Sequence, residues 1–156
     1  MKILKINTLS ILLLFIGLSM NSLAQIKTVE LPVLKSENPW NEKDLIEPAA
    51  LSKILSGEGR KPMIFNIGVA QNIIGAKSFG GVSDAQNLEN FIAALKKLPK
   101  DTYLVYYCGC CPFVKCPNIR PAYKALKSLG FTEAKLLNLR TNLKTDWIAK
   151  GYPISQ

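Results

Sequence analysis

Three segments of the chain are almost continuously apolar and too short for buried helices. They are residues 62–67 (PMIFNI), 102–107 (TYLVYY) and 134–139 (AKLLNL). An apolar run of roughly four to eight residues between turn residues is typical of a strand that is covered on both faces. The second segment is also rich in β-branched and aromatic residues, which favour strands. We therefore predict three buried strands.

The apolar residues between these segments follow the period of a helix. Leu88, Phe91, Ile92 and Leu95 share one face of a helix expected from about Asp84. Pro48 at a first helical position and Gly57 as a stop signal bound another helix, at 48–57. The remaining predicted helices are around 122–129 and in a short stretch of 144–154.

Strands that alternate with helices indicate an α/β fold, in which a parallel central sheet is flanked by helices on both faces. Residues 73–81 (IIGAKSFGG) are rich in glycine, and we predict a turn there. In parallel sheets the functional site lies outside the carboxyl ends of the strands. The segment between the strand 102–107 and the next helix is therefore where a site is expected.

The N-terminal residues have the pattern of a secretory signal peptide. Lys2 and Lys5 precede an apolar run at 11–18, and small residues follow before Gln25. The alternative is a membrane anchor, but the run is shorter than the roughly twenty residues that span a bilayer. We predict a signal peptide at 1–24, an extended arm at 25–44 and a single domain at 45–154. The protein is expected to be exported, to a periplasm, with no membrane contact after cleavage.

Composition narrows the chemistry further. The chain contains no histidine, which excludes a Ser-His-Asp triad, a Cys-His protease pair and a histidine proton shuttle. It carries 20 Lys and Arg against 11 Asp and Glu, a net charge of +9. This excess is either a solvated lysine-rich surface or a field that steers small anions. No nucleic-acid partner is expected, because basic and aromatic residues are not clustered.

All four cysteines lie in the loop after the second predicted strand. They are Cys108, Cys110, Cys111 and Cys116, within the sequence YCGCCPFVKCPNIRPA. A cysteine between a strand end and a helix start lies near backbone N–H groups and a partial positive charge, which lower its pKa toward the thiolate. The same environment stabilises a persulfide anion. We therefore expect Cys108 to be negatively charged and exposed.

The order of motifs around this loop resembles the rhodanese-like sulfurtransferase family. The carrying motifs are Tyr107-Cys108, Arg120, Ala125-Leu126 and Gly130-Phe131, followed by the strand 134–139, Trp147 and Gly151-Tyr152-Pro153. Upstream, MIFNIG and IIGAKSFGG are similar to the family's first strand and turn, so the resemblance covers about residues 40–154. The chain has Asn66-Ile67-Gly68 where the family usually has Asp-x-Arg, and its loop from Cys108 to Arg120 is longer.

The resemblance implies a rhodanese-like fold and persulfide transfer on Cys108, with Arg120 as an anion-binding group. Cys116 is the second candidate nucleophile, because Pro117 in a first helical turn would place it at the helix cap. Cys110 and Cys111 are adjacent, so a disulfide between them is strained, and we expect them to act as resolving or relaying thiols. The implied partners are a small anionic sulfur donor, similar to thiosulfate, and a thiol acceptor. No cofactor is expected.

Three other functions remain open for the same loop. The C-x-x-C formed by Cys108 and Cys111 is compatible with a thiol–disulfide redox protein. The thiolates of Cys108, Cys110, Cys111 and Cys116 could instead chelate a soft metal such as Cu(I), whereas their spacing does not match structural zinc sites. The last alternative is an inactive rhodanese homologue whose cysteines form a local disulfide.

Overall fold

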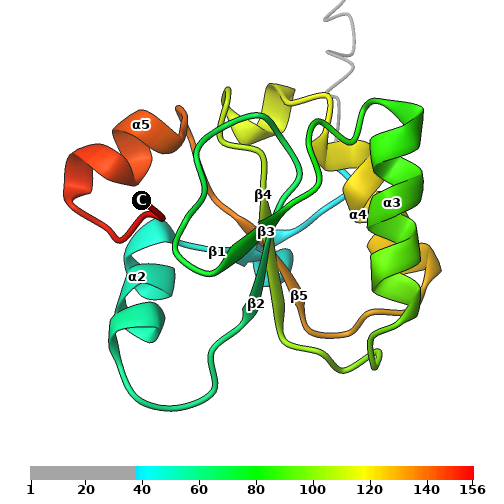
Figure 1. Cartoon of the computed structure of the whole chain (residues 1–156), viewed down its shortest axis with the longest axis horizontal. Helices are drawn as coiled ribbons and strands as arrows, with labels where there is room; N and C mark the ends of the chain where they lie inside the picture. The colour runs from blue at the N-terminus through cyan, green and yellow to red at the C-terminus, as the bar shows by residue number, and fades with distance from the viewer. Residues whose placement is uncertain (1–37) are drawn as a thin grey trace, which may run out of the picture. The chain divides into compact units, whose positions relative to one another are not determined.

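A five-stranded parallel sheet forms the centre of the molecule (Figure 1). The computed structural model describes residues 38–156. The strands are β1 (Leu45–Ile46), β2 (Met63–Asn66), β3 (Ala76–Ser78), β4 (Leu104–Tyr107) and β5 (Ala134–Leu137). Their order is β1-β5-β4-β2-β3, and every neighbouring pair is parallel. The predicted parallel sheet is confirmed, and β4 is its central strand.

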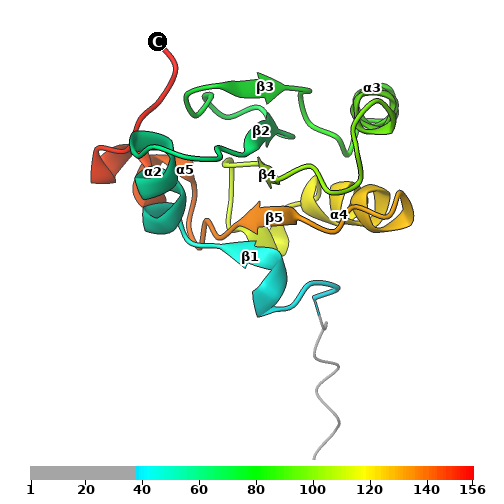
Figure 2. The same cartoon turned by 90° about the horizontal axis from the view of Figure 1, so that it is seen from below.

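Helices cover both faces of this sheet, as predicted. The helices are α2 (Pro48–Ser56), α3 (Ala85–Lys96), α4 (Ile119–Ser128) and α5 (Leu143–Asp146). Three short 3-10 helices join them: η2 (Glu42–Asp44), η3 (Phe113–Lys115) and η4 (Ile148–Lys150). Figure 2 shows α3 and α4 on one face and α2 and α5 on the other. The protein is therefore an α/β protein with helices around a parallel sheet.

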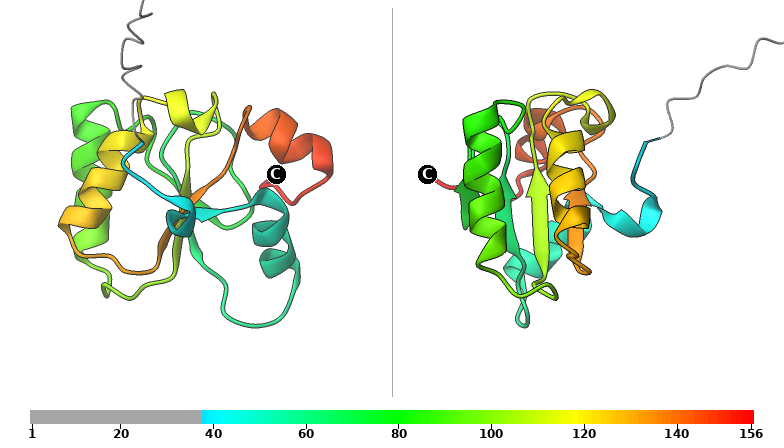
Figure 3. Two further views of the ribbon diagram at one scale, coloured as in Figure 1. Left: turned by 180° about the vertical axis from the view of Figure 1, so that it is seen from behind. Right: turned by 90° about the vertical axis from the view of Figure 1, so that its right-hand side faces the viewer.

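The alternation of side chains along the strands divides the interior into two cores. Leu104 and Tyr106 of β4 pack with residues of α3 and α4, whereas Val105 and Tyr107 pack with residues of α2 and α5. All four β4 residues are buried, since the strand is covered on both faces. Figure 3 shows α3 and α4 side by side on the same face of the sheet. The side chain that follows Tyr107 therefore points toward the face of α3 and α4.

Two of the strands were not predicted. β3 is only three residues long and lies within the glycine-rich segment predicted as a turn, where its apolar content is too low for recognition. β1 has two residues and directly follows the predicted arm, at the start of the predicted domain, where it pairs with β5. The signal peptide at 1–24 and most of the arm at 25–44 lie outside the described residues. Within residues 38–156, no helix combines the length and apolar character needed to cross a bilayer.

Candidate functional site

Cys108 directly follows the central strand and lies at its carboxyl end. Because side chains alternate along a strand, Cys108 points to the same face as Leu104 and Tyr106, toward the beginning of α4. The residue is only 2% exposed. The expectation of an exposed Cys108 is therefore wrong, because the sheet is covered on both faces here and the thiol enters the core shared with α3 and α4.

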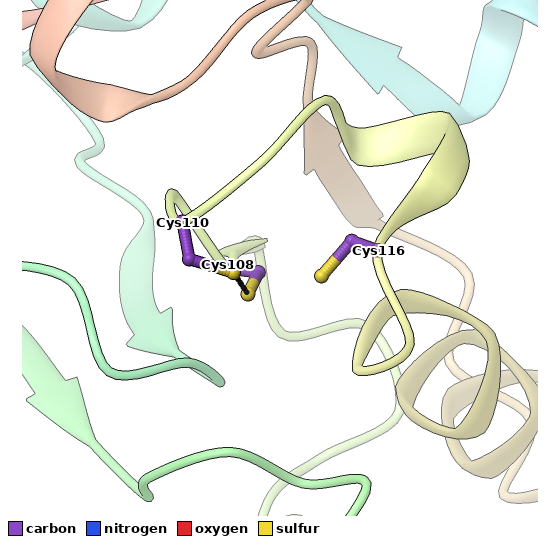
Figure 4. A group of neighbouring side chains, drawn as sticks. All are labelled: Cys108, Cys110 and Cys116. Atoms are coloured by element: carbon purple, nitrogen blue, oxygen red, sulfur yellow. Dashed lines mark hydrogen bonds between the residues drawn. The ribbon is translucent and has the colours of Figure 1, made fainter.

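Three cysteine thiols meet around this position. The Sγ atoms of Cys108 and Cys110 are 3.2 Å apart, and those of Cys108, Cys110 and Cys116 all lie within 4.8 Å of one another. Figure 4 shows the Cys116 thiol pointing toward the Cys108–Cys110 pair from the other side of the loop. Cys111 lies outside this group, with its Sγ 3.4 Å from that of Cys110. All four cysteines are free thiols; Cys108 and Cys116 are buried, and Cys110 is exposed.

A glycine allows the loop to turn back at this point. Gly109 has a φ of +81°, in the left-handed region that favours glycine. A Cβ atom on Gly109 would also lie 2.9 Å from the Cβ of Ala70 and 3.0 Å from that of Leu143. The tight turn therefore requires glycine, and it brings the thiol of Cys110 back over that of Cys108.

Asn118 connects this thiol group to the first turn of α4. Its amide Nδ2 donates a hydrogen bond to Cys108 Sγ at 3.2 Å, and its Oδ1 accepts one from the backbone N–H of Ser83 at 2.8 Å. Asn118 is the N-cap residue of α4, but its side chain caps no helical N–H group. The prediction that Cys116 lies at the helix cap is wrong, since the N-cap residue of α4 is Asn118 and Cys116 is the C-cap residue of η3.

These contacts favour a thiolate at Cys108. Hydrogen bonds from the Cys116 thiol, the Asn118 amide, and the backbone N–H and thiol of Cys110 lower the pKa of Cys108 to about 5, against the opposing effect of burial. Burial and the hydrogen bond that the Cys110 thiol donates to Cys108 raise the pKa of Cys110 to about 12. The pKa of Cys116 is raised, first because its thiol donates to Cys108 and then by burial. The arrangement is therefore one thiolate surrounded by protonated thiols.

Gly68, after the neighbouring strand β2, makes room for Cys108. A Cβ atom on Gly68 would lie 2.5 Å from both the Sγ and the carbonyl oxygen of Cys108. The backbone N–H of Gly68 donates to Oδ1 of Asn66, whose Nδ2 in turn donates to Ala70 O and to Oδ1 of Asn72. The Asn66-Ile67-Gly68 segment therefore builds the wall against which Cys108 lies.

Arg120 makes its contacts away from the thiols. Its guanidinium donates to the carbonyl of Val114 at 3.1 Å and to Oδ1 of Asn38 at 3.1 Å, and it stacks over the ring of Trp40 at 5.4 Å. No hydrogen bond joins Arg120 to a cysteine within residues 38–156. The anion-binding role predicted for Arg120 therefore has no support in these contacts. The side chain instead joins η3 to the segment that contains Asn38 and Trp40.

Sequence reasoning did not select Gly68 and Asn118 as functional residues. Gly68 follows a predicted strand, and the carboxyl ends of parallel strands meet at one edge of a sheet, so its proximity to Cys108 could have been predicted. Asn118 precedes a predicted helix and is a common N-cap residue. Its use as a donor to sulfur depends on the exact course of the cysteine loop, which has no simple sequence signal.

The fold and the site define an α/β protein whose central strand ends in a buried cysteine, which contacts other thiols and the amide of Asn118. No protein-family model matches the chain, and no curated protein matches its sequence. Among solved structures, the chain is similar to a substituted form of EanB in complex with hercynine, at 19% identity with a TM-score of 0.49. The match covers 72% of this chain and 27% of that chain, so this protein spans about a quarter of the other's length. At these values the similarity carries no argument about the site.

Proposed function

We propose that this protein is a rhodanese-like sulfurtransferase that carries sulfane sulfur on Cys108. The observation that supports this function is the set of donors around Cys108 Sγ, which stabilises a negatively charged sulfur at the carboxyl end of the central strand. A thiolate is the nucleophilic form of cysteine, and the same donors would stabilise the persulfide anion that forms on it.

The proposed reaction has two steps. The Cys108 thiolate attacks the outer sulfur of an anionic donor such as thiosulfate; the sulfur–sulfur bond of the donor breaks, and sulfite leaves with the bonding electrons. The persulfide on Cys108 then passes its outer sulfur to an acceptor thiol. Without residues 1–24, which contain Lys2 and Lys5, the chain carries 18 Lys and Arg against 11 Asp and Glu, and this net charge of +7 supports attraction of an anionic donor.

Access to Cys108 depends on its exposed neighbour. Cys108 is 2% exposed, and the exposed thiol of Cys110 lies against it. An exposed side chain changes rotamer within picoseconds to nanoseconds. Rotation of the Cys110 thiol away from Cys108 would open the path along which the donor approaches.

Intact mass spectrometry of the reduced protein after exposure to thiosulfate tests the proposal. In samples quenched early in the first turnover, the expected result is the added mass of one sulfur atom, which is lost on treatment with cyanide and absent in Cys108→Ser. Cys111→Ser is the matched control, because Cys111 lies in the same loop but outside the group of three thiols. An adduct that persists in Cys108→Ser would assign the sulfur to another cysteine.

We also propose that residues 1–24 are a signal peptide and that the protein works in a periplasm. The support is the sequence pattern alone, with two lysines before an apolar run and small residues before Gln25. N-terminal sequencing of the protein from a periplasmic fraction tests this proposal. A mature chain that begins at Gln25 is expected, and a chain that retains Met1 would contradict it.

A soft-metal site is the second candidate function. The Sγ atoms of Cys108, Cys110 and Cys116 lie within 4.8 Å of one another, and thiolates are the ligands that Cu(I) prefers. Cys111 does not belong to this group, so the ligand set is smaller than the four cysteines that the sequence indicated. Protein isolated without chelators would then contain stoichiometric copper, and removal of the copper would release free thiols. Metal-free protein with full sulfur transfer would exclude this function.

A further inference from the structure

The thiol of Cys110 has a position that transfer to an external acceptor does not require. Its Sγ lies 3.2 Å from that of Cys108, whereas a disulfide bond is about 2.05 Å long, so a shift of about 1 Å would bond the two sulfurs. Cys110 is also the exposed member of the group. The pair therefore combines a buried sulfur carrier with a solvent-accessible thiol in direct contact with it.

We propose that Cys110 attacks the persulfide on Cys108 within the same molecule, so that the protein releases hydrogen sulfide and forms a Cys108–Cys110 disulfide. This inference rests on the proposed loading of sulfur onto Cys108, and it replaces the second step, transfer to an acceptor thiol, with reduction of the persulfide by Cys110. It makes the protein a sulfane-sulfur reductase rather than a carrier that passes sulfur to another molecule.

The atoms and electrons of this step balance. The Cys110 sulfur attacks the inner sulfur of the Cys108 persulfide, the bond between inner and outer sulfur breaks, and the outer sulfur leaves as hydrosulfide with the bonding electrons. The proton of the Cys110 thiol goes to the departing sulfur or to solvent. The sulfane sulfur gains two electrons, and the two thiols lose them. A reduced dithiol protein or small dithiol then restores the two thiols by exchange.

Geometry selects Cys110 from the three auxiliary thiols. Cys116 is fully buried and approaches from the other side of the loop, so a reductant has no access to its sulfur (Figure 4). Cys111 contacts Cys110 at 3.4 Å, but its thiol is not part of the group around Cys108. A disulfide that includes Cys110 presents an exposed sulfur to the reductant, as thiol–disulfide exchange requires.

The turn at Gly109 also favours the Cys108–Cys110 pair. A bond between residues two positions apart closes a small ring, which needs a sharp reversal of the backbone. Gly109 has this reversal already, with its φ of +81°. The pair is therefore arranged for closure before any sulfur is loaded.

A single-turnover experiment tests the inference. The fully reduced protein is freed of reductant and mixed with one equivalent of thiosulfate; sulfide and sulfite are then measured together with the protein mass. In the wild type we expect one sulfide per sulfite, and a protein mass lower by two hydrogen atoms. In Cys110→Ser we expect sulfite release with a stable persulfide on Cys108, and at least a tenfold lower yield of sulfide. Cys111→Ser should behave as the wild type.

Peptide mapping adds a readout that needs no variant. Trypsin cleaves after Lys115 and thereby separates Cys116 from the other three cysteines, which share the peptide 101–115. A Cys108–Cys110 disulfide lies within this one peptide, whereas a bond to Cys116 would join it to the peptide 116–124. Fragmentation between Cys110 and Cys111 then identifies the partner of Cys108.

The possible failures are distinguishable. Wild-type sulfide release from Cys110→Ser, or a disulfide mapped to Cys111 or Cys116, overturns the inference and leaves sulfur transfer on Cys108 intact. A Cys110→Ser protein that folds as the wild type does but gains no sulfur on Cys108 overturns the proposed function itself. Because Cys110 is exposed, serine at this position is compatible with the fold, and circular dichroism checks it.

Discussion

The two helices that lie side by side on one face of the sheet begin in different ways. At the start of α3, Oδ1 of Asp84 accepts a hydrogen bond from the backbone N–H of Asn87 at 3.0 Å, which is an ordinary helix cap. At the start of α4, the side chain of Asn118 caps nothing and instead binds Cys108 Sγ and the N–H of Ser83. The first helix start stabilises its own helix, whereas the second serves the site.

The chemical difference between the two residues explains this division. A carboxylate only accepts hydrogen bonds, whereas a carboxamide both accepts and donates. Asn118 therefore satisfies Ser83, the residue next to Asp84, with its oxygen and the Cys108 thiolate with its nitrogen. A missing side-chain cap costs about 1 kcal/mol of helix stability. At α4 the side-chain cap is missing, but the Asn118 amide donates a hydrogen bond to Cys108 while its oxygen accepts one from Ser83. Only asparagine and glutamine carry a carboxamide that can do both.

The largest effect is expected when the start of α4 receives the residue found at the start of α3. In Asn118→Asp, a carboxylate replaces the donor beside Cys108, and both the lost hydrogen bond and the like charge raise the pKa of Cys108. The wild-type rate of persulfide formation should rise with pH around a midpoint near 5. In the variant this midpoint moves upward, and the rate at neutral pH falls about tenfold or more.

The reciprocal substitution is the control. Asp84→Asn keeps a good N-cap residue at α3, so both the pH midpoint and the free energy of unfolding should stay at their wild-type values. An Asn118→Asp variant with an unchanged midpoint would show that the Asn118 amide does not stabilise the thiolate.

A smaller shift is expected from the removal of the other main donor. Cys116→Ala deletes the thiol that contributes most to the low pKa of Cys108. The midpoint for persulfide formation should rise by about one to two pH units, because a hydrogen bond to the charged form is lost without the addition of a like charge. Cys116→Ser retains a donor and should keep the midpoint close to 5. Equal midpoints in both variants would contradict the role of Cys116 as a donor.

Arg120, in the first turn of α4, should affect stability rather than chemistry. Arg120→Ala removes hydrogen bonds to Val114 and Asn38 and the stacking over Trp40, and we expect the free energy of unfolding to fall by about 1–2 kcal/mol. The dependence of persulfide formation on pH and on thiosulfate concentration should not change. A weaker dependence on thiosulfate, with unaltered stability, would instead restore the anion-binding role that the sequence predicted.

The smallest effect is expected at the ordinary cap. Asp84→Ala should lower the free energy of unfolding in urea by about 1 kcal/mol, because the N–H of Asn87 loses its side-chain acceptor. Persulfide formation should be unaffected at every pH. An altered pH midpoint in this variant would mean that the two helix starts are coupled through Ser83 and would weaken the contrast between them.

Much of the fold could be predicted, because its long elements have strong periodic patterns. The helix at α2 begins at Pro48 and is followed by Gly57, and α3 follows its cap at Asp84, as expected from start and stop signals. The three apolar segments form β2, β4 and β5, which lie together at the centre of the sheet. The edge strands β1 and β3 were missed, since strands of two and three residues carry no detectable period.

The position of the site could also be predicted, but its internal arrangement could not. A parallel sheet places its site at the carboxyl ends of the strands, and Cys108 lies there. The burial of Cys108 follows from its place directly after a strand that is covered on both faces, and it could have been derived. The course of the loop depends on Gly109 and on hydrogen bonds between residues far apart in the sequence, such as Phe113 N–H to Leu139 O. For this reason the contacts of Arg120 and Cys116 were not predictable.

The absence of a side chain at Gly68 couples the sequence after β2 to the sequence after β4, which is a form of epistasis between positions 68 and 108. Any larger residue there would occupy the volume that the sulfur and carbonyl oxygen of Cys108 now fill. A larger residue at position 68 is therefore compatible with the fold only if the backbone at the end of β4 is displaced as well. Natural variants and designed libraries should therefore change positions 68 and 108 together, because substitution of Gly68 alone produces a clash with Cys108.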